Sequence, residues 1–261
     1  MTVDRLRAAL SPIIIVVAFL AAWQWGIFHS IFSIPEFAVP LPTSIVDVLS
    51  REFGEFSTAF EQSASAFVLG WILGNGAGFG AAVLCLGLKQ STRDSVSRAL
   101  GSLQALPMVA TAPIIALWTD SSLGLKVTTV VIMVFPQMLV YSLRGLSSTD
   151  RSVIDLALSY DASGTQTFRM FRLPTAIPHI FTGLKYSIVL ALVGVVVCEI
   201  IRTADGLGYL IHDALQSFSA PTAWGSVVII SLIGIVSYLI LAILEPIIAP
   251  WTFQHRDRAA S

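Results

Sequence analysis

The stretch DLALSYDASGTQTFRMFRLPTAIPH, residues 155–179, is polar and rich in hydroxyl groups, although the chain around it is mostly apolar. Ser152 followed by Asp155, and Ser163 followed by Gln166, have the spacing of capping boxes, in which two side chains cap a helix N-terminus reciprocally. The pattern predicts two short helices with a turn at 161–164 between them, and Pro174 is expected to end the second helix. Both carry more apolar residues than a solvated linker needs, which favours a docking element for another protein.

Residues with the usual chemistry of catalysis or metal binding do not form a recognisable pattern. The histidines are scattered over different expected loops, and the two cysteines fall within apolar segments: His29, His179, His212, His255, Cys85 and Cys198. A metal site or disulfide framework requires closer, regular spacing. The chain also lacks the phosphate-binding pattern G-x-x-x-x-G-K-[ST], since every lysine follows a leucine. The sequence therefore predicts no catalytic residue, no metal site and no bound cofactor.

Glu199 is the one acid deep enough in an apolar segment to be costly there, and such acids are functional by default. Two interpretations stay open: a role in a translocation pathway or gate, or a simple ion pair with Arg202 near the outer surface. Pro107 and Pro113 interrupt LQALPMVATAPIIALW, where freed carbonyls need a neighbouring helix or an aqueous cavity. The kinked segment either lines a pathway or only packs. Candidate pathway residues are thus Pro107, Met108, Pro113 and Glu199.

The composition shows which kind of protein must position these groups. Apolar residues make up 55% of the chain, charged residues only 12%, and the mean hydropathy is +0.81, as in an integral membrane protein. The apolar segments lack the alternation of barrel strands, so they predict an all-α fold. We expect one polytopic domain, residues 1–261, with six transmembrane helices at about 10–29, 60–87, 99–118, 126–143, 180–200 and 223–248.

The distribution of basic residues predicts the orientation. With the N-terminus inside, 12 of the 15 Lys and Arg residues are expected on the cytoplasmic side and only Arg51, Lys126 and Arg202 outside, as the positive-inside rule requires. Both termini and the loop 144–179 are then cytoplasmic. The first apolar segment has no clear cleavage site and is expected to be a retained helix. The basic residues are dispersed and the net charge is -1, which argues against a nucleic-acid partner.

Two local patterns predict how the helices begin and pack. Gly70, Gly74 and Gly78 recur at steps of four, a doubled G-x-x-x-G that lets another helix approach closely. In VPLPTSIVDVL, Thr43 or Ser44 is expected to cap a short amphipathic helix that lies flat at the outer surface.

Residues 155–174 resemble the EAA loop of ABC importer permeases. That motif reads EAA, three residues, Gly, nine residues, Ile, one residue, Leu-Pro, and this chain has the same spacings with Asp155, Leu156, Ala157, Asp161, Phe171, Leu173 and Pro174. The segments GLKYSIVLALVGVVVCEI, DGLGYLI and LQALPMVATAPIIALW are similar to the nitrate, sulfonate and taurine group of these permeases. Aspartate in place of the motif's glycine is tolerable, because Asp is among the residues least penalised at positive φ.

The resemblance implies a role for each loop residue. Asp155 orients the loop or meets a basic group of an ATPase, Ala157 allows close approach, and Asp161 forms the turn. Arg169 and Arg172 either pair with acids of the ATPase or act only as positive-inside anchors, and Leu173-Pro174 fixes where the loop re-enters the membrane. The ATPase-coupling set is then Asp155, Leu156, Ala157, Asp161, Arg169, Phe171, Leu173 and Pro174.

The resemblance also implies the function. The chain is expected to be a non-enzymatic permease subunit in a bacterial inner membrane, working with a second permease copy or a homologue. Two cytoplasmic ATP-binding subunits would hold ATP and Mg²⁺, and an extracytoplasmic binding protein would deliver the solute. The expected substrate is a sulfonate, taurine, nitrate or related small anion, with an uncharged heterocycle such as a pyrimidine precursor or riboflavin as the alternative. A secondary transporter would need coupled ionisable groups or an inverted repeat, and neither pattern is visible.

Overall fold

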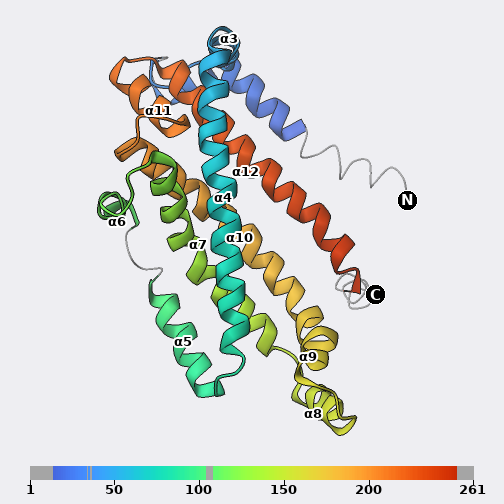
Figure 1. Cartoon of the computed structure of the whole chain (residues 1–261). Coiled ribbons are helices and arrows are strands. Elements are labelled where there is room, and N and C mark those ends of the chain that lie inside the picture. Colours follow the sequence, from blue (N-terminus) through green and yellow to red (C-terminus); the bar gives the residue numbers. More distant parts are fainter. Residues whose placement is uncertain (1–13, 34, 36, 104–107, 252–261) are drawn as a thin grey trace, which may run out of the picture.

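The computed structural model describes residues 14–33, 35, 37–103 and 108–251, and every regular element within these ranges is helical (Figure 1). Four helical stretches are long and apolar enough to cross a membrane: Phe53–Cys85, Ser122–Ser147, Gly164–Ile201 and Ala220–Ile248. The all-α expectation is therefore confirmed. The labelled helices are α2 Ile27–Phe32, α3 Pro42–Arg51, α4 Phe53–Cys85, α5 Gln90–Leu103, α6 Met108–Ile115, α7 Ser122–Ser147, α8 Arg151–Ser159, α9 Gly164–Thr167, η1 Phe168–Arg172, α10 Leu173–Ile201, α11 Leu207–Gln216 and α12 Ala220–Ile248.

The long helices form an elongated bundle with two distinct ends. Helices α3 and α11 lie at one end and α5, α8 and α9 at the other, which we name the α11 end and the α8 end (Figure 1). Helix α7 runs to the α8 end, the chain passes through α8, and α9, η1 and α10 return as one helical stretch of 38 residues. Helices α7 and α10 are thus the two helices that the polar stretch of the sequence connects.

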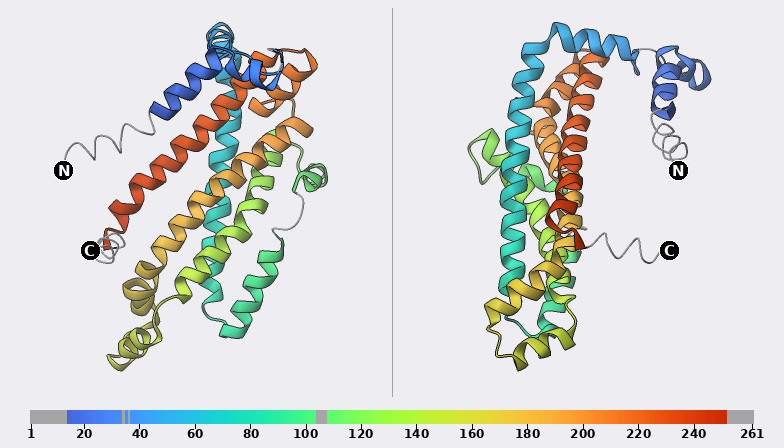
Figure 2. Two further views of the ribbon diagram at one scale, coloured as in Figure 1. Left: turned by 180° about the vertical axis from the view of Figure 1, so that it is seen from behind. Right: turned by 90° about the vertical axis from the view of Figure 1, so that its right-hand side faces the viewer.

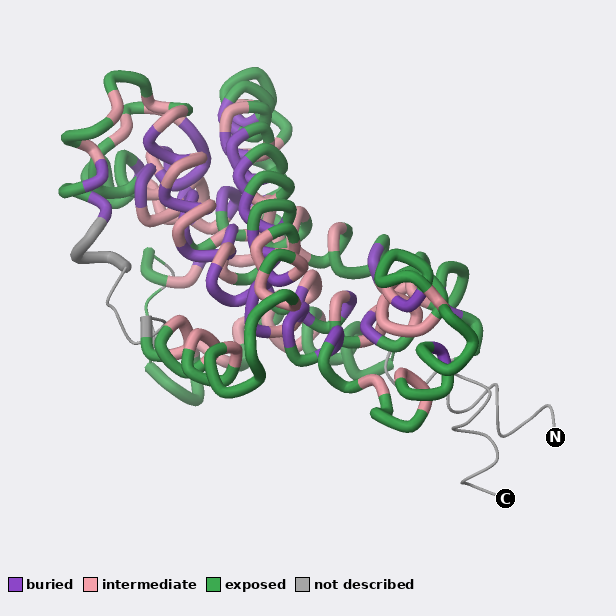
Figure 3. Tube along the Cα trace, turned by 60° about the horizontal axis from the view of Figure 1, so that its bottom comes forward, coloured by how far each residue is buried: buried purple, intermediate pink, exposed green. Residues whose placement is uncertain are grey.

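Glycines in α4 set how closely it packs on α7. A Cβ at Gly70 would lie 2.6 Å from the Cβ of Val130, and one at Gly78 would lie 2.7 Å from the carbonyl oxygen of Phe135. Such contacts are possible only for residues without a side chain, so the expected G-x-x-x-G packing is confirmed. Buried positions gather where the long helices face one another (Figure 3). In the most apolar part of each helix, 61% of α7 is buried but only 6% of α12, so α7 is central and α12 peripheral.

The helix expected at about 10–29 is interrupted. The described part, Ile14–Gln24, ends at a turn where Gly26 has φ +68°, and α2 begins at Ile27. This first helix stands apart from the bundle in the right-hand view of Figure 2. It is joined to α12 by the edge-to-face rings of Trp23 and Trp224, 5.7 Å apart. A glycine in the left-handed region ends a helix readily, which explains the interruption.

The helix expected at about 99–118 is described only in part. The chain there forms α5, with 14 residues, and α6, with eight, while 104–107 lie outside the described residues. Helix α5 begins nine residues earlier than expected and carries charged groups such as Arg93 and Arg98. Helix α6 ends two residues after Pro113, which cannot donate a backbone hydrogen bond. The expected capping of α3 by Thr43 or Ser44 is wrong as well, because Pro42 starts the helix and the N–H of Thr43 donates instead to the side chain of Gln24 at 3.1 Å.

Candidate coupling loop and charge junction

Helix α8 begins one residue before the expected cap. The carboxylate of Asp150 accepts hydrogen bonds from the backbone N–H of Ser152 at 3.0 Å and from its hydroxyl at 2.9 Å. These two hydrogen bonds, the backbone one first, lower the pKa of Asp150. The expected capping box at Ser152 is therefore wrong, because a nearer carboxylate is the better acceptor for the first free N–H groups.

The turn after α8 explains the residue that stands at the motif's glycine position. Asp161 has φ +57°, its N–H donates to the carbonyl of Leu158, and the N–H of Ala162 donates to the carbonyl of Ala157, both at 3.0 Å. This pair of bonds is the Schellman ending of a helix, in which the residue after the cap adopts the left-handed conformation. The expected turn at Asp161 is confirmed, and its strain is that of a non-glycine residue at positive φ.

The second helix begins at the predicted capping box. The N–H of Gln166 donates to the Ser163 hydroxyl at 3.3 Å, and the N–H of Ser163 donates to the Gln166 side chain at 2.7 Å. Pro174 does not end this helix, contrary to expectation. The N–H of Leu173 bonds to the carbonyl of Phe168 in a wide π-helical turn just before the proline. Such a turn accommodates a ring that cannot donate, so the loop continues directly into α10.

The expected coupling residues fall into an exposed and an enclosed group. Asp155, Leu156, Asp161 and Arg169 are exposed, whereas Phe171, Leu173 and Pro174 are partly buried. Ala157 is only 5% exposed, so its small side chain permits close packing within the chain's own loop. Further exposed apolar side chains surround the first group, namely Leu158, Tyr160 and Met170.

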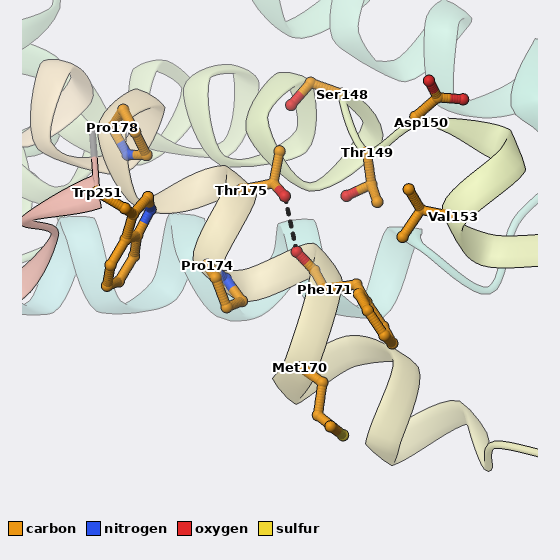
Figure 4. Close-up of a pocket in the computed structure, with 10 residues that line it drawn as sticks. All are labelled: Ser148, Thr149, Asp150, Val153, Met170, Phe171, Pro174, Thr175, Pro178 and Trp251. Atoms are coloured by element: carbon orange, nitrogen blue, oxygen red, sulfur yellow. Dashed lines mark hydrogen bonds between the residues drawn. The ribbon is translucent and has the colours of Figure 1, made fainter. Parts of the chain in front are cut away.

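A groove of about 690 Å³ opens beside this loop (Figure 4). Its walls come from the turn before α8, from η1, from the first turns of α10 and from Trp251. The Thr175 hydroxyl donates to the carbonyl of Phe171 at 2.8 Å across the η1–α10 turn. The lining residues are Ser148, Thr149, Asp150, Val153, Met170, Phe171, Pro174, Thr175, Pro178 and Trp251.

At the α11 end, three helices meet at buried charges. The ammonium of Lys126 in α7 lies 3.0 Å from Oε1 of Glu199 in α10, and their side chains are 1% and 0% exposed. The same ammonium lies 3.0 Å from Oδ1 of Asp205, which also accepts from the Ser122 hydroxyl at 2.6 Å. We name Lys126, Glu199 and Asp205 the charge junction. Glu199 is thus paired as one interpretation expected, but its partner is Lys126 and not Arg202.

The charge junction also receives the N-terminus of α11. Backbone N–H groups donate from Gly206 to Gln62, from Leu207 to Ser63 and from Gly208 to Glu199, at 2.8–2.9 Å. The Ser63 hydroxyl in turn donates to Glu199 at 2.7 Å. A helix N-terminus carries partial positive charge, so a buried carboxylate facing it is stabilised. Side chains of α4 and α10 therefore cap α11 from outside.

Comparison with known proteins identifies the family. Residues 68–254 match the profile of the binding-protein-dependent transport system inner membrane component. The chain belongs to this family. The permease is therefore a multi-pass inner-membrane transport subunit and not an enzyme, and its family works with an ATPase and a solute-binding protein.

Three relatives illustrate the range of solutes within the family. The permease is 32% identical over 172 residues to the formylaminopyrimidine transport permease of Halalkalibacterium halodurans, covering 64% of this chain and 69% of that protein. It is 30% identical over 158 residues to the riboflavin transport system permease of Chloroflexus aurantiacus, covering 60% and 59%. It is 25% identical over 168 residues to the taurine transport system permease of Escherichia coli, covering 64% and 61%.

The expected pathway residues are only partly brought together. Pro107 lies outside the described residues, and Met108 is the first residue of α6. Helix α6 packs beside the charge junction, because its Ala112 and Ile115 cluster with Leu125 and with Cys198 of α10. Pro113 is exposed. The arrangement joins α6 to the region of Glu199.

Sequence reasoning missed Lys126 and a second ion pair. Lys126 was counted only as an outer basic residue, since its acid lies 73 positions away. Lys185 of α10 pairs with Glu245 of α12, and its ammonium also lies 5.6 Å from the ring centroid of Tyr238. Among the described residues, no group of three or more His, Cys, Asp or Glu could hold a metal ion.

Proposed function

We propose that the permease forms the translocation pathway of an ABC importer and docks on its ATPase through the segment 150–172, the coupling loop. The observation that carries the proposal is the geometry of this loop. It projects from one end of the bundle, it exposes Leu156, Tyr160 and Met170 beside a groove, and it connects the two helices that pack at the centre. Exposed apolar groups of this kind require a protein partner in water.

The loop residues then divide between contact and shape. Asp155 and Arg169 make charged contacts with the ATPase, and Leu156 supplies an apolar contact. Ala157 and Asp161 set the turn that presents α8. Phe171, Leu173 and Pro174 fix the angle at which the loop enters α10.

The proposed assembly has the usual division of labour. Two ATP-binding subunits hold ATP and Mg²⁺, a binding protein delivers the solute to the α11 end, and a second permease, identical or homologous, completes the pathway. The α8 end faces the cytoplasm, as do both termini, because most basic residues lie on that side. Together with the first helix and the α5–α6 segment, the four long helices make six membrane crossings in one domain.

For the solute, we favour an uncharged heterocycle over a sulfonate, taurine, nitrate or similar anion. The relatives at 32% and 30% identity are named for formylaminopyrimidine and riboflavin. The charges support the same choice: Lys126 and Lys185 are each paired with a carboxylate, so neither offers a free cation to an anion. Pro107, Met108 and Pro113 of the α6 region are proposed to line the pathway. Glu199 is too enclosed to meet the solute and acts through its ion pair.

Docking is tested by co-purification. The tagged chain is purified in mild detergent from its host with and without Asp155→Lys plus Arg169→Glu. The matched control is Glu55→Lys plus Arg51→Glu, which reverses one acidic and one basic charge on exposed residues at the α11 end. We expect an ATP-binding subunit with the wild type and the control but not with the loop variant. An ATPase absent from all three preparations would overturn the importer and favour an ATPase-independent transporter.

The solute class is tested with the purified transporter in proteoliposomes together with its binding protein. Uptake of labelled riboflavin or formylaminopyrimidine is measured against an excess of unlabelled taurine or nitrate. We expect competition among the heterocycles and none from the anions. Uptake of taurine or nitrate with no heterocycle uptake would overturn the choice of solute and leave the importer intact.

A further inference from the structure

We propose that the charge junction locks the α11 segment, residues 203–219, to α7 and α10, so that this segment moves as one body with the coupling loop at the opposite end. Lys126, Glu199 and Asp205 are then positioning residues for transport. The inference rests on the proposed function, because it says which part of the permease moves together with the coupling loop.

The first step is that α7 and α10 behave as a single unit. Glycines at three levels let the two helices touch closely. A Cβ at Gly145 would lie 2.8 Å from the Cβ of His179, one at Gly183 would lie 2.9 Å from the Cβ of Tyr141, and one at Gly194 would lie 2.9 Å from the sulfur of Met133. This close packing resists sliding of α7 against α10, because a tightly packed protein interior does not deform continuously.

The second step is that the ends of this unit carry the two functional regions. The coupling loop is the covalent connection between the end of α7 at Ser147 and the start of α10 at Leu173. At the other end, the same helices are joined by the pair Lys126–Glu199. A displacement applied at the loop therefore reaches the charge junction through two helices that are fixed to each other at both ends.

The third step is that the α11 segment is attached at the charge junction. The backbone N–H groups at the start of helix α11, those of residues 206–208, donate to the side chains of Gln62, Ser63 and Glu199. Asp205, just before the helix, is held by Lys126 and Ser122 of α7. The glycines at the start of the segment permit this closeness, because a Cβ at Gly206 would lie 2.0 Å from Oε1 of Glu199.

The burial of these charges makes the attachment specific. A lysine and a glutamate without water depend on each other for their stability, so separating them strands a charge in an apolar surrounding. The other end of the segment is open: Leu215 and Phe218 are 63% and 90% exposed. The segment thus presents a free surface at the α11 end while its base is fixed to α7 and α10.

The test compares two ion pairs in the assembled transporter. Lys126→Met plus Glu199→Gln removes the charge junction's fully buried pair. Asp205 also loses Lys126, but its side chain is 30% exposed and keeps the Ser122 hydroxyl, so no buried charge is stranded. The matched control is Lys185→Met plus Glu245→Gln. It removes the ion pair between α10 and α12, and neither residue of this pair contacts the α11 segment. Spin labels are placed at Tyr160→Cys on the coupling loop and Leu215→Cys on α11, both exposed, in chains diluted with unlabelled copies and carrying Cys85→Ser.

In the wild type and the control we expect one narrow distance distribution between the labels, the same without nucleotide and with ATP. In the charge-junction variant we expect a broadened, nucleotide-dependent distribution. Its transport should fall about 5- to 150-fold, the range of ordinary coupling free energies, while basal ATP hydrolysis is retained. A wild-type distance that changes with nucleotide, or a charge-junction variant with the control's distribution and transport, overturns the inference.

If the double variant fails to fold, Asp205→Asn serves in its place, with the exposed Asp213→Asn of α11 as its control. Asp205→Asn leaves Lys126 and Glu199 paired and weakens only the link to α7, so it should broaden the distances to a smaller degree. A distribution identical to that of Asp213→Asn would count against the inference. Loss of the ATPase from the wild-type complex would instead be a failure of the proposed function.

Discussion

The packing of α4 on α7 provides a prediction whose size follows from the structure. Gly78→Ala adds one methyl group where its carbon would lie 2.7 Å from the carbonyl oxygen of Phe135 and 3.0 Å from the backbone nitrogen of Leu139. Backbone atoms cannot rotate away, so α4 and α7 must separate by about 0.7 Å to reach the 3.4 Å of ordinary contact. Overpacking of this kind costs about 1–3 kcal/mol.

The matched control is Gly76→Ala in the same helix, where an added Cβ meets nothing within 4 Å. Both substitutions gain the same helix propensity of about 1 kcal/mol, so that contribution cancels in the comparison. The remaining difference in unfolding free energy, about 1–3 kcal/mol, corresponds to a Tm about 2–12 °C lower for Gly78→Ala.

The assay is thermal unfolding of both purified variants in one detergent, followed by fluorescence-detected gel filtration after heating. We expect Gly76→Ala to equal or exceed the wild type and Gly78→Ala to lie clearly below both. Equal Tm values for the two variants would show that the helices separate at no cost, and the argument from close approach would be refuted.

Three further predictions concern the ends of the bundle. Gly206→Ala, at φ +95° and against a carboxylate oxygen, should sharply reduce the yield of folded protein, whereas Gly54→Ala, which meets nothing within 4 Å, should not. Ser163→Ala removes a capping box and should destabilise the start of the second loop helix by about 1 kcal/mol, visible as faster hydrogen exchange there. Burial raises the pKa of Asp205, but hydrogen bonds and the charge of Lys126 outweigh it, so the net pKa lies below 3.8. The stability that ionised Asp205 gives the folded protein is therefore fully present above pH 3.8 and is lost as the pH falls through the lowered pKa. Below about pH 4 the Tm of the wild type should fall more steeply than that of Asp205→Asn.

The coupling loop was largely predictable because its signals are local. The capping box at Ser163 and the turn at Asp161 are each determined by residues a few positions apart, and both are confirmed. The N-cap of α8 was predicted at Ser152 but is Asp150, because the Asp150 side chain accepts from the first free N–H groups of the helix. The continuation through Pro174 was missed because a π-helical turn has no sequence signature as clear as the proline that it accommodates.

The charge junction was not predictable for the opposite reason. Glu199 stood out as a costly acid, but its partner depends on which helix lies opposite, and Lys126 is 73 residues away. Counting Lys126 among the outer basic residues concealed its burial. The available clue was that a lysine four residues into an apolar helix needs an acid at the same depth.

The register of the long helices depends on contacts between residues far apart in the sequence. In hydrocarbon, apolar faces do not discriminate among partners, because lipid tails are as apolar as leucine. Register must then come from shape and charge. Glycine notches fix α4 against α7 and α7 against α10, while Lys126–Glu199 and Lys185–Glu245 pair α7 with α10 and α10 with α12. Slipping α7, α10 or α12 by one turn, about 5.4 Å, would remove a lysine from its acid. Each ion pair therefore selects one alignment, and the charge junction adds α11 to the set that α10 aligns.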